Sequence, residues 1–396
     1  MMAPCQTRIL IVDDSAVMRS LLRAVVGTDA RLLVAGTAAD GASALNLLQT
    51  VQPDIVLLDV EMPVMDGLAT LRALRQRWRK IPVIMCSSLT QRGAKVTIEA
   101  LACGAADYVT KPSGQSDRET AVSILAQELI PKIVALTCSA TESYNPPQRL
   151  FTPGMPRVLG APTTRAGALS PAARSAFVSP SQPIPSTPSV VLIGVSTGGP
   201  AALDVLLPAL PERFPVPVLI VQHMPELFTR LLAERLNNRC RLSVREASEG
   251  DPVRAGSIYI ARGNWHMELA AAALPESPAT LRLNQGPQEN HCRPSVDVLF
   301  RSAASVFGSG ILAVVLTGMG SDGMKACRTI RELGGTVLAQ DESTSTVWGM
   351  PGAVANAGLA NKVLPLEMIA PEILRITTQS SPSVQLAHNH LGQVVS

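Results

Sequence analysis

The segment Leu192–Leu203 reads LIGVSTGGPAAL. A run of aliphatic residues stops at Ser196, which stands among glycines and shortly precedes a proline. This pattern is typical of a buried strand that turns sharply into a helix, and it fits a phosphate loop, a dinucleotide loop, a nucleophile turn or an ordinary tight turn. No Gly-Lys-Ser/Thr follows and the spacing is not G-x-G-x-x-G, so both phosphate-type loops are disfavoured. The choice between a nucleophile and a plain turn depends on what lies at the ends of the neighbouring strands.

Strand-like and helix-like segments alternate on both sides of this stretch. Short apolar runs rich in β-branched residues are separated by segments of helical period, which predicts parallel sheets covered by helices on both faces. The runs of the second half are VVLIGVS, PVLIVQH, SIYIA, ILAVVLTG and TVLA, and those of the first half are RILIV, LLVAGT, DIVLLD, PVIMCSS and DYVT. The predicted fold class is therefore α/β, with two doubly wound parallel-sheet domains.

The composition predicts where these domains end. A chain of 396 residues is long for one core. The region 138–188 is rich in proline, serine and alanine and has no sustained period, so it is predicted to be a linker. The predicted domains are 5–128 and 189–380, followed by a polar, flexible tail at 381–396.

Charge and cysteine content exclude several classes of protein. A net charge of +3 gives no general electrostatic reason to bind nucleic acid or a membrane surface. The seven cysteines are odd in number and contain no CxxC pair, which favours reduced thiols over disulfides or a zinc site. Carboxylates come before any N-terminal apolar segment long enough for a signal peptide, and no window has about 18 or more uninterrupted apolar residues. We therefore expect a cytoplasmic protein that is not inserted in a membrane.

A base and an orienting acid for Ser196 can be found at the same predicted sheet edge. His223 ends the strand PVLIVQ, and Asp322 lies in the glycine-rich loop TGMGSDGM that follows ILAVVL. The carboxyl ends of parallel strands open on one edge of a sheet, so the three side chains are expected to meet there. The chain order Ser, His, Asp differs from the α/β-hydrolase order Ser, Asp, His, which argues against that fold but keeps triad chemistry.

The other histidines are weaker candidates. His388 and His390 lie in the predicted tail, whereas His266 and His291 are interpreted as structural, hydrogen-bonded residues. Asp297 falls inside the helical pattern SVDVLF and is interpreted as a partly buried structural carboxylate.

The first domain gathers a second set of polar residues at its strand ends. Asp13 and Asp14 follow the first strand, Asp59 ends the third, Ser87 the fourth, and Lys111 follows the fifth. Clustered carboxylates repel one another unless a cation lies between them, and an oxygen-only donor set favours Mg²⁺. One carboxylate could then act as a nucleophile toward a phosphoryl group, while the hydroxyl and the ammonium neutralise the transferred oxygens.

These residues resemble the receiver domain of bacterial two-component response regulators, through ILIVDDS, LLDVEMPVMDG, the serines at 87–88 and YVTKP. The resemblance implies a flavodoxin-like fold in which Asp59 accepts phosphate from a histidine kinase. It also implies specific roles for the remaining residues. Asp13, Asp14, Asp59 and the backbone carbonyl of Glu61 hold Mg²⁺, Ser87 and Tyr108 form the phosphate-sensing switch pair, and Lys111 contacts the phosphate.

The second domain resembles the catalytic domain of the chemotaxis protein-glutamate methylesterases, which also carry an N-terminal receiver. The matching motifs are GVSTGGP, IVQHMP, SIYIARG, HMEL, CRPSVDVLF and LTGMGSDGM. The resemblance implies a Rossmann-like domain with Ser196 as nucleophile, His223 as base and then acid, and Asp322 as orienting carboxylate. Asn264 and Trp265 depart from the charged pair that the family often has, and the linker is long for the family.

The resemblance also implies the reaction and its partners. Glutamate γ-methyl esters of methyl-accepting chemotaxis receptors are hydrolysed to release methanol, with a glutamine deamidase side activity and with no cofactor for ester hydrolysis. The backbone N–H groups of Thr197, Gly198 and Met319 are the candidate oxyanion donors. A chemotaxis histidine kinase is the expected phosphodonor, and phosphorylation is expected to uncover the Ser196 edge.

Three alternatives are weighed against this reading. A gated esterase or amidase could act on a protein outside chemotaxis. A transcription-type response regulator would need a basic helix-turn-helix after the receiver, where the sequence instead has a second α/β pattern. A non-catalytic module would not need the Ser, His and Asp set, which is intact.

Overall fold

The structure is a computed structural model that describes residues 6–112, 117–137, 187–272, 274 and 277–378. Both folded regions belong to one compact unit. The predicted linker, apart from residues 187–188, and the predicted tail lie outside the described residues.

The first domain is a five-stranded parallel sheet in the order β2-β1-β3-β4-β5. Its elements are β1 (Thr7–Val12), α1 (Ala16–Val26), β2 (Leu32–Ala38), α2 (Gly41–Val51), β3 (Ile55–Asp59), α3 (Gly67–Arg77), β4 (Val83–Ser87), α4 (Gln91–Ala102), β5 (Asp107–Thr110) and α5 (Arg118–Thr137). The prediction of a doubly wound parallel sheet is confirmed for this domain.

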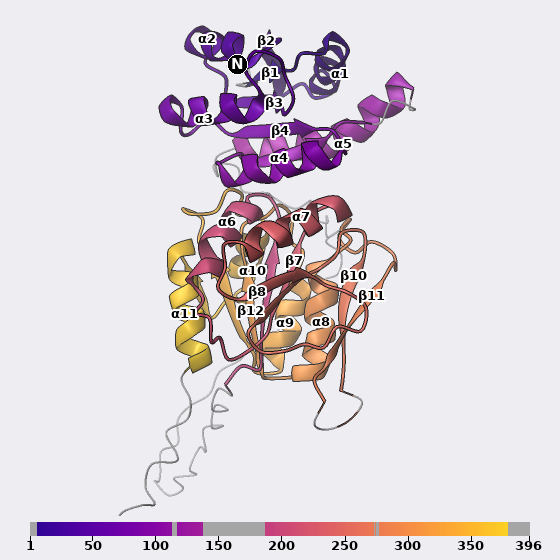
Figure 1. Cartoon of the computed structure of the whole chain (residues 1–396), viewed down its shortest axis with the longest axis vertical. Coiled ribbons are helices and arrows are strands. Elements are labelled where there is room, and N and C mark those ends of the chain that lie inside the picture. Colours follow the sequence, from indigo (N-terminus) through magenta and orange to yellow (C-terminus); the bar gives the residue numbers. More distant parts are fainter. Residues whose placement is uncertain (1–5, 113–116, 138–186, 273, 275–276, 379–396) are drawn as a thin grey trace, which may run out of the picture. The chain divides into compact units, whose positions relative to one another are not determined.

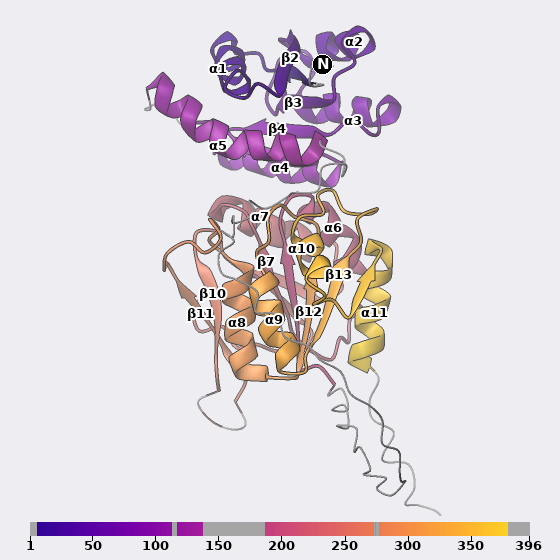
Figure 2. The same ribbon diagram turned by 180° about the vertical axis from the view of Figure 1, so that it is seen from behind.

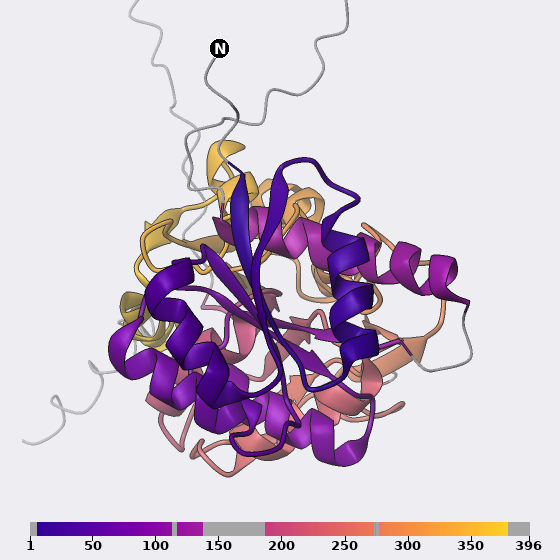
Figure 3. The same cartoon turned by 90° about the horizontal axis from the view of Figure 1, so that it is seen from above.

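The strands of this sheet are apolar on both faces because helices cover both (Figure 3). Leu10 and Leu58 pack with α2, α3 and α4, whereas Ile9 and Leu57 pack with α1 and α5. Side chains of adjacent strand residues point to opposite faces, so a strand buried between two helix layers needs consecutive aliphatic residues.

Helix α5 is long and apolar enough, by length and composition, to cross a membrane, and it is the one such helix in the part of the chain that the structure describes. Its side chains Leu125, Leu129 and Ile133 are fully buried in the core that they share with α1. Packing inside the first domain therefore accounts for the apolar residues on this face of α5.

The second domain has a seven-stranded parallel sheet in the order β14-β13-β12-β6-β7-β9-β8 and a separate antiparallel pair, β10-β11. Its elements are β6 (Val190–Val195), α6 (Gly199–Leu206), the short 3₁₀ helix η1 (Leu207–Ala209), β7 (Val218–Gln222), α7 (Glu226–Asn237), β8 (Ser243–Glu246), β9 (Ser257–Ile260), β10 (His266–Ala270), β11 (Thr280–Asn284), α8 (Val296–Phe307), β12 (Ile311–Val315), α9 (Met324–Glu332), β13 (Thr336–Gln340), α10 (Met350–Asn356), β14 (Lys362–Leu364) and α11 (Leu366–Thr378).

The order of strands in this sheet reverses between β6 and β12. From β6 the chain moves to β7 on one side, and it later returns to β12 on the other side. Helices α6, α7 and α11 cover one face (Figure 1), and α8, α9 and α10 cover the opposite face (Figure 2). Open α/β sheets bind ligands at such a switch point, outside the carboxyl ends of the strands. Ser196 follows β6 and Asp322 follows β12, so both lie at this crevice.

The strand pattern missed β8, β10, β11 and β14. Strands β8 and β14 lie at the two edges of the large sheet, and β10 and β11 form a hairpin outside it. Edge and hairpin strands alternate apolar with polar residues or are very short, so they lack the continuous aliphatic run that marks a central strand.

A contact between β6 and α8 holds the nucleophile strand against the helix that approaches Asp322. A Cβ placed on Gly194 would lie 2.5 Å from Val296 Cγ1, which is closer than van der Waals contact permits. We expect Gly194→Ala to lower the free energy of unfolding by about 1–3 kcal/mol through overpacking. The measurement is urea denaturation of the full chain.

The control for this prediction is the double variant Gly194→Ala/Val296→Ala. Removal of the Val296 methyl groups makes room for the new Cβ, so the double variant is expected to be more stable than the sum of the two single changes predicts. Strict additivity of the two single effects would contradict this contact.

Candidate active site

Strand register places Ser196 and His223 next to each other. In the ladder between β6 and β7, Val195 pairs with Gln222. The next residue on each strand is therefore Ser196 on the β6 side and His223 on the β7 side. The backbone N–H of His223 donates to the carbonyl of Val195 over 3.2 Å, and the N–H of Ser196 donates to the carbonyl of Thr317 beyond β12 over 3.0 Å. The sheet itself therefore sets the spacing of the predicted nucleophile and base.

The turn after Ser196 needs its two glycines. Gly198 has φ +79°, and a Cβ there would lie 2.3 Å from Thr346 Oγ1. A Cβ on Gly199 would lie 2.0 Å from Gln222 Oε1, and the N–H of Gly199 donates to the Ser196 carbonyl over 2.8 Å. The glycines thus allow a tight strand-to-helix turn in which Ser196 is partly exposed while its neighbours are buried.

His223 and Asp322 form a hydrogen-bonded pair. His223 Nε2 lies 2.8 Å from Asp322 Oδ2, and the side chains are 12% and 3% exposed, respectively. A carboxylate at Nε2 keeps the proton on that nitrogen, so the neutral ring offers its lone pair at Nδ1. In chymotrypsin-type enzymes the carboxylate binds Nδ1 and the base is Nε2, so the imidazole here has the reverse orientation.

The Asp322 carboxylate is bound at the N-terminus of α8. It accepts hydrogen bonds from the backbone N–H groups of Val296 (2.7 Å) and Asp297 (3.0 Å). Ser295 Oγ donates at 2.9 Å and Asn290 Nδ2 at 2.8 Å. Unpaired N–H groups at the start of a helix stabilise negative charge, so Asp322 is fixed both in position and in its ionised form.

This arrangement moves the two pKa values of the pair apart. Burial raises the pKa of Asp322, but hydrogen bonds from His223 and from the α8 backbone outweigh it and lower the pKa to about 2. Burial lowers the pKa of His223, but its contacts with Asp322 and Cys292 outweigh that effect and raise it to about 9. The imidazole is therefore a strong base held by a permanently ionised carboxylate.

The predicted oxyanion donors lie close to Ser196 in the chain or in space. Among the described residues, none accepts a hydrogen bond from the backbone N–H of Thr197, Gly198 or Met319. Gly318, before Met319, approaches the nucleophile so closely that a Cβ on it would lie 2.8 Å from Ser196 Cβ. These N–H groups have no acceptor among the described residues, and their role as oxyanion donors stays a prediction.

Of the other candidate residues, His266 and Asp297 have structural partners, whereas no described residue forms a hydrogen bond with the ring of His291, which was expected to be hydrogen-bonded. His266 is buried, with Nε2 2.9 Å from the carbonyl of Pro287 and Nδ1 accepting from the Ser295 N–H at 3.3 Å. His291 is exposed and has φ +62°. Asp297 was expected to be partly buried but is fully buried, because it accepts hydrogen bonds from the Ala326 N–H (2.8 Å) at the start of α9 and from Asn290 Nδ2 (2.9 Å).

Sequence reasoning missed several residues that shape this site. Asn290 joins the carboxylates of Asp297 and Asp322, and Gln222 Nε2 donates to the Ser196 carbonyl over 2.9 Å. Cys292 Sγ lies 3.6 Å from His223 Nδ1. The serine that precedes the helical pattern VDVLF is a signal that could have indicated Ser295 as a helix cap, but no sequence pattern indicates that α8 binds an aspartate from another loop.

In the first domain, the predicted phosphorylation site brings a lysine ammonium into contact with two carboxylates. Lys111 Nζ lies 2.8 Å from Asp13 Oδ2 and 2.7 Å from Asp59 Oδ1, and Asp14 is exposed beside them. Burial and the charge of Asp13 raise the pKa of Asp59, although Lys111 opposes this. For Lys111, burial lowers the pKa, but its contacts with both carboxylates outweigh it and raise the pKa.

The donors of this pocket fit Mg²⁺. Carboxylate oxygens of Asp13, Asp14 and Asp59 lie within 4.8 Å of one another, and all are hard ligands. The Glu61 N–H lies 3.4 Å from Asp59 Oδ1, and the role of the Glu61 carbonyl stays a prediction. Ser87 ends β4 and Tyr108 is the second residue of the neighbouring strand β5; both are buried, and their role as a switch pair stays a prediction.

Comparison with known proteins matches both domains. Residues 9–123 match the response regulator receiver domain, and residues 191–373 match CheB methylesterase. A protein-glutamate methylesterase/protein-glutamine glutaminase from a Nocardioides species is 46% identical over 95% of this chain and 97% of its own. A protein of the same name from Trichodesmium erythraeum is 44% identical over 93% and 98%. The crystal structure of the Thermotoga maritima CheB methylesterase catalytic domain is 41% identical, covers 48% of this chain and 100% of that chain, and has a TM-score of 0.46.

The pKa of His223 provides a direct test of its bond to Asp322. In an NMR titration of the imidazole ring we expect a midpoint at about 9 in the wild type and a lower midpoint in Asp322→Asn, because a neutral amide does not stabilise the imidazolium against burial. The exposed carboxylate Glu332 provides the control, since Glu332→Gln should leave the midpoint in place. An unchanged midpoint in Asp322→Asn would refute the pairing.

Proposed function

Because the chain belongs to the family of protein-glutamate methylesterases/protein-glutamine glutaminases that join a receiver domain to a CheB methylesterase domain, we propose that it removes methyl groups from methyl-accepting chemotaxis receptors when its receiver is phosphorylated. The resemblance inferred from the motifs is confirmed. The observation that carries the proposal is the hydrogen bond between His223 and Asp322 at the sheet edge where Ser196 follows β6.

Ser196 is the proposed nucleophile. Its Oγ attacks the carbonyl carbon of a glutamate γ-methyl ester while His223 Nδ1 accepts the hydroxyl proton. The positive charge on the ring is then balanced by Asp322 at Nε2, which stays ionised because α8 binds it. Only the neutral imidazole accepts a proton, so we expect the rate to increase as the pH rises toward about 9.

The tetrahedral intermediate carries its negative charge on the former carbonyl oxygen. The N–H groups of Thr197, Gly198 and Met319 are the proposed donors to this oxygen. His223 returns its proton to the leaving methoxide, methanol departs, and His223 then activates the water that hydrolyses the acyl-serine. With a glutamine side chain the same steps release ammonia, which accounts for the glutaminase activity.

Phosphorylation is proposed at Asp59, whose carboxylate attacks the phosphoryl group of a histidine kinase. Asp13, Asp14 and Asp59 would hold Mg²⁺, which when bound neutralises charge on the phosphoryl oxygens. Lys111 lies against Asp59 and is the proposed phosphate contact, and Ser87, at the end of the strand that pairs with β3, is the proposed phosphate sensor.

Contacts of receiver residues with residues near Ser196 support a regulatory role. Thr197 Oγ1 donates to Asp107 Oδ2 over 2.6 Å, directly beside the nucleophile. Tyr108, the proposed switch residue, stacks on Phe228 of α7 with ring centroids 4.4 Å apart. These contacts give the receiver two points at which movement of β5 reaches the catalytic edge.

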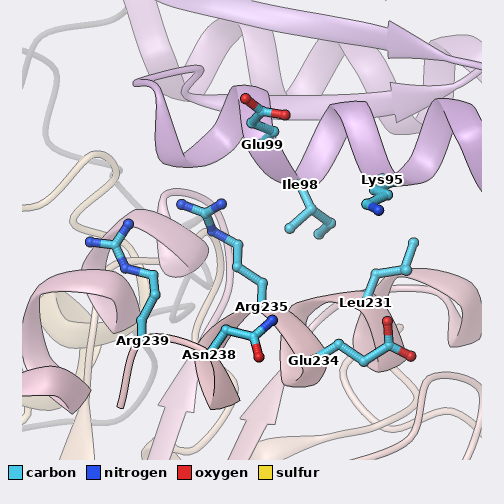
Figure 4. A pocket seen from close by; sticks show the side chains of 8 residues that line it. All are labelled: Lys95, Ile98, Glu99, Leu231, Glu234, Arg235, Asn238 and Arg239. Atoms are coloured by element: carbon cyan, nitrogen blue, oxygen red, sulfur yellow. The ribbon is translucent and has the colours of Figure 1, made fainter.

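A pocket between α4 and α7 adds to this contact (Figure 4). It is lined on one side by three residues of α4 and on the other by residues of α7 and the segment after it. The lining residues are Lys95, Ile98, Glu99, Leu231, Glu234, Arg235, Asn238 and Arg239. The pocket includes none of the predicted catalytic residues, so we assign it to the contact and not to substrate.

The proposed location is the cytoplasm. The cysteines among the described residues are all free thiols, which fits a reducing compartment. A chemotaxis histidine kinase is the proposed phosphodonor.

Ser196→Ala tests the catalytic assignment. The substitution removes the attacking oxygen, so we expect methanol release from methylated receptor membranes to fall below about 1% of the wild-type rate with the fold intact. Ser305→Ala on the exposed side of α8 is the matched control and should keep full activity. Activity above a few per cent in Ser196→Ala would refute the assignment. If the wild type released methanol only from methylated proteins other than the receptors, those proteins would be the substrate instead.

Phosphorylation is tested with a small phosphodonor and Mg²⁺. We expect the donor to raise the methanol release rate of the wild type but not of Asp59→Asn. We also expect Asp107→Ala to raise the rate without donor, because it removes the acceptor of the Thr197 hydroxyl. Glu119→Ala, an exposed change on α5, is the control. An unchanged methanol release rate of active wild-type protein after addition of the donor would contradict the proposed regulation by phosphorylation.

A further inference from the structure

A thiol lies at the nitrogen that the proposed mechanism uses as its base. Cys292 Sγ is 3.6 Å from His223 Nδ1, whereas Asp322 occupies the opposite nitrogen. One ligand atom each from Cys292, His223 and Asp322 lies within 4.8 Å of the others. Cys292 contributes to the raised pKa of His223, but the proposed ester hydrolysis gives its thiol no chemical step.

The loop that carries Cys292 is held in place from several sides. The backbone of Cys292 exchanges two hydrogen bonds with Glu289, at 2.9 and 3.2 Å. Glu289 is bound in turn by both terminal nitrogens of Arg301 on α8. Between them, Asn290 and His291 adopt positive φ angles of 53° and 62°, which close a tight turn. The thiol therefore lies beside the imidazole on a turn that is fixed by hydrogen bonds.

The geometry matches a thiophilic metal ion. Zinc binds imidazole nitrogen at about 2.0–2.1 Å and thiolate sulfur at about 2.3 Å, so two such donors of a tetrahedral ion are about 3.5 Å apart. The observed separation of 3.6 Å needs almost no adjustment. A histidine that binds a metal through one ring nitrogen usually donates the N–H of its other ring nitrogen to a carboxylate. Asp322 occupies that position at His223 Nε2.

We propose that Cys292 Sγ and His223 Nδ1 form a binding site for a divalent cation of the zinc class, and that the bound ion switches the esterase off. The cation displaces the thiol proton to solvent and forms bonds to sulfur and to the Nδ1 lone pair. Water or Ser196 Oγ completes the coordination. His223 then has no lone pair with which to accept the Ser196 proton. The inhibitory part of this proposal rests on the proposed function, whereas the binding part does not.

This site differs in chemistry from the acidic pocket of the receiver. The receiver offers only carboxylate oxygens, which suit Mg²⁺, while the Cys292 site offers sulfur and nitrogen. An excess of Mg²⁺ therefore blocks the first site and leaves the second free. The two cation effects can be separated in one full-length preparation.

Binding is tested by Co²⁺ titration of full-length Ser196→Ala in excess Mg²⁺, with absorbance in the near ultraviolet as readout. A cobalt–thiolate bond gives a charge-transfer band, which we expect in Ser196→Ala and expect to be lost in Ser196→Ala/Cys292→Ala. The partly buried Cys240 provides the matched control, since Ser196→Ala/Cys240→Ala should keep the band. A band that persists without Cys292, or no band at all, overturns the proposal.

Inhibition is tested by Zn²⁺ titration of methanol release in the same buffer. Each variant is compared with its own metal-free rate. We expect wild type and Cys240→Ala to be inhibited alike, and Cys292→Ala to need at least about tenfold more Zn²⁺ for half inhibition. Equal sensitivity of Cys292→Ala and wild type overturns the inhibitory role. If no methanol is released by any variant, the proposed function fails, while the Co²⁺ band still decides whether the site exists.

Discussion

The Asp322 carboxylate, held at the first turn of α8, is the interaction on which the second domain's site depends. Two backbone N–H groups, a serine hydroxyl and an asparagine amide converge on it before it meets His223. Each donor favours the ionised carboxylate, so these hydrogen bonds together keep a negative charge buried and oriented. The raised basicity of His223 follows from that charge.

The same corner ties the chemistry to the packing of the whole domain. Helix α8 lies on the face opposite α6 and α7, yet its N-terminus reaches the crevice between β6 and β12. Asp297, one residue into α8, binds the start of α9, and Asn290 connects it to Asp322. A change in the position of α8 would therefore alter both the carboxylate and the loop that carries it.

The sequence allowed the fold class and the positions of Ser196, His223 and Asp322 to be predicted, because each follows a central aliphatic strand and parallel strands end on one edge. It did not predict Asn290, Cys292 or the orientation of the imidazole, since these lie in or depend on a loop without periodicity. Edge strands such as β8 and β14 were missed for a related reason, because short half-exposed strands carry little hydrophobic signal. Burial of Asp297 could not be inferred from a helical pattern alone, since its partner Ala326 is 29 residues away.

The pairing of Val195 with Gln222 has a consequence for how such a protein can diversify. The spacing of Ser196 and His223 is a property of a backbone ladder in the middle of a sheet, so it does not depend on the identity of surrounding loop residues. Asn264, Gln285 and Arg293 lie instead on loops joined by their own hydrogen bonds. Natural variation can therefore change those loops while strand pairing maintains the spacing of Ser196 and His223.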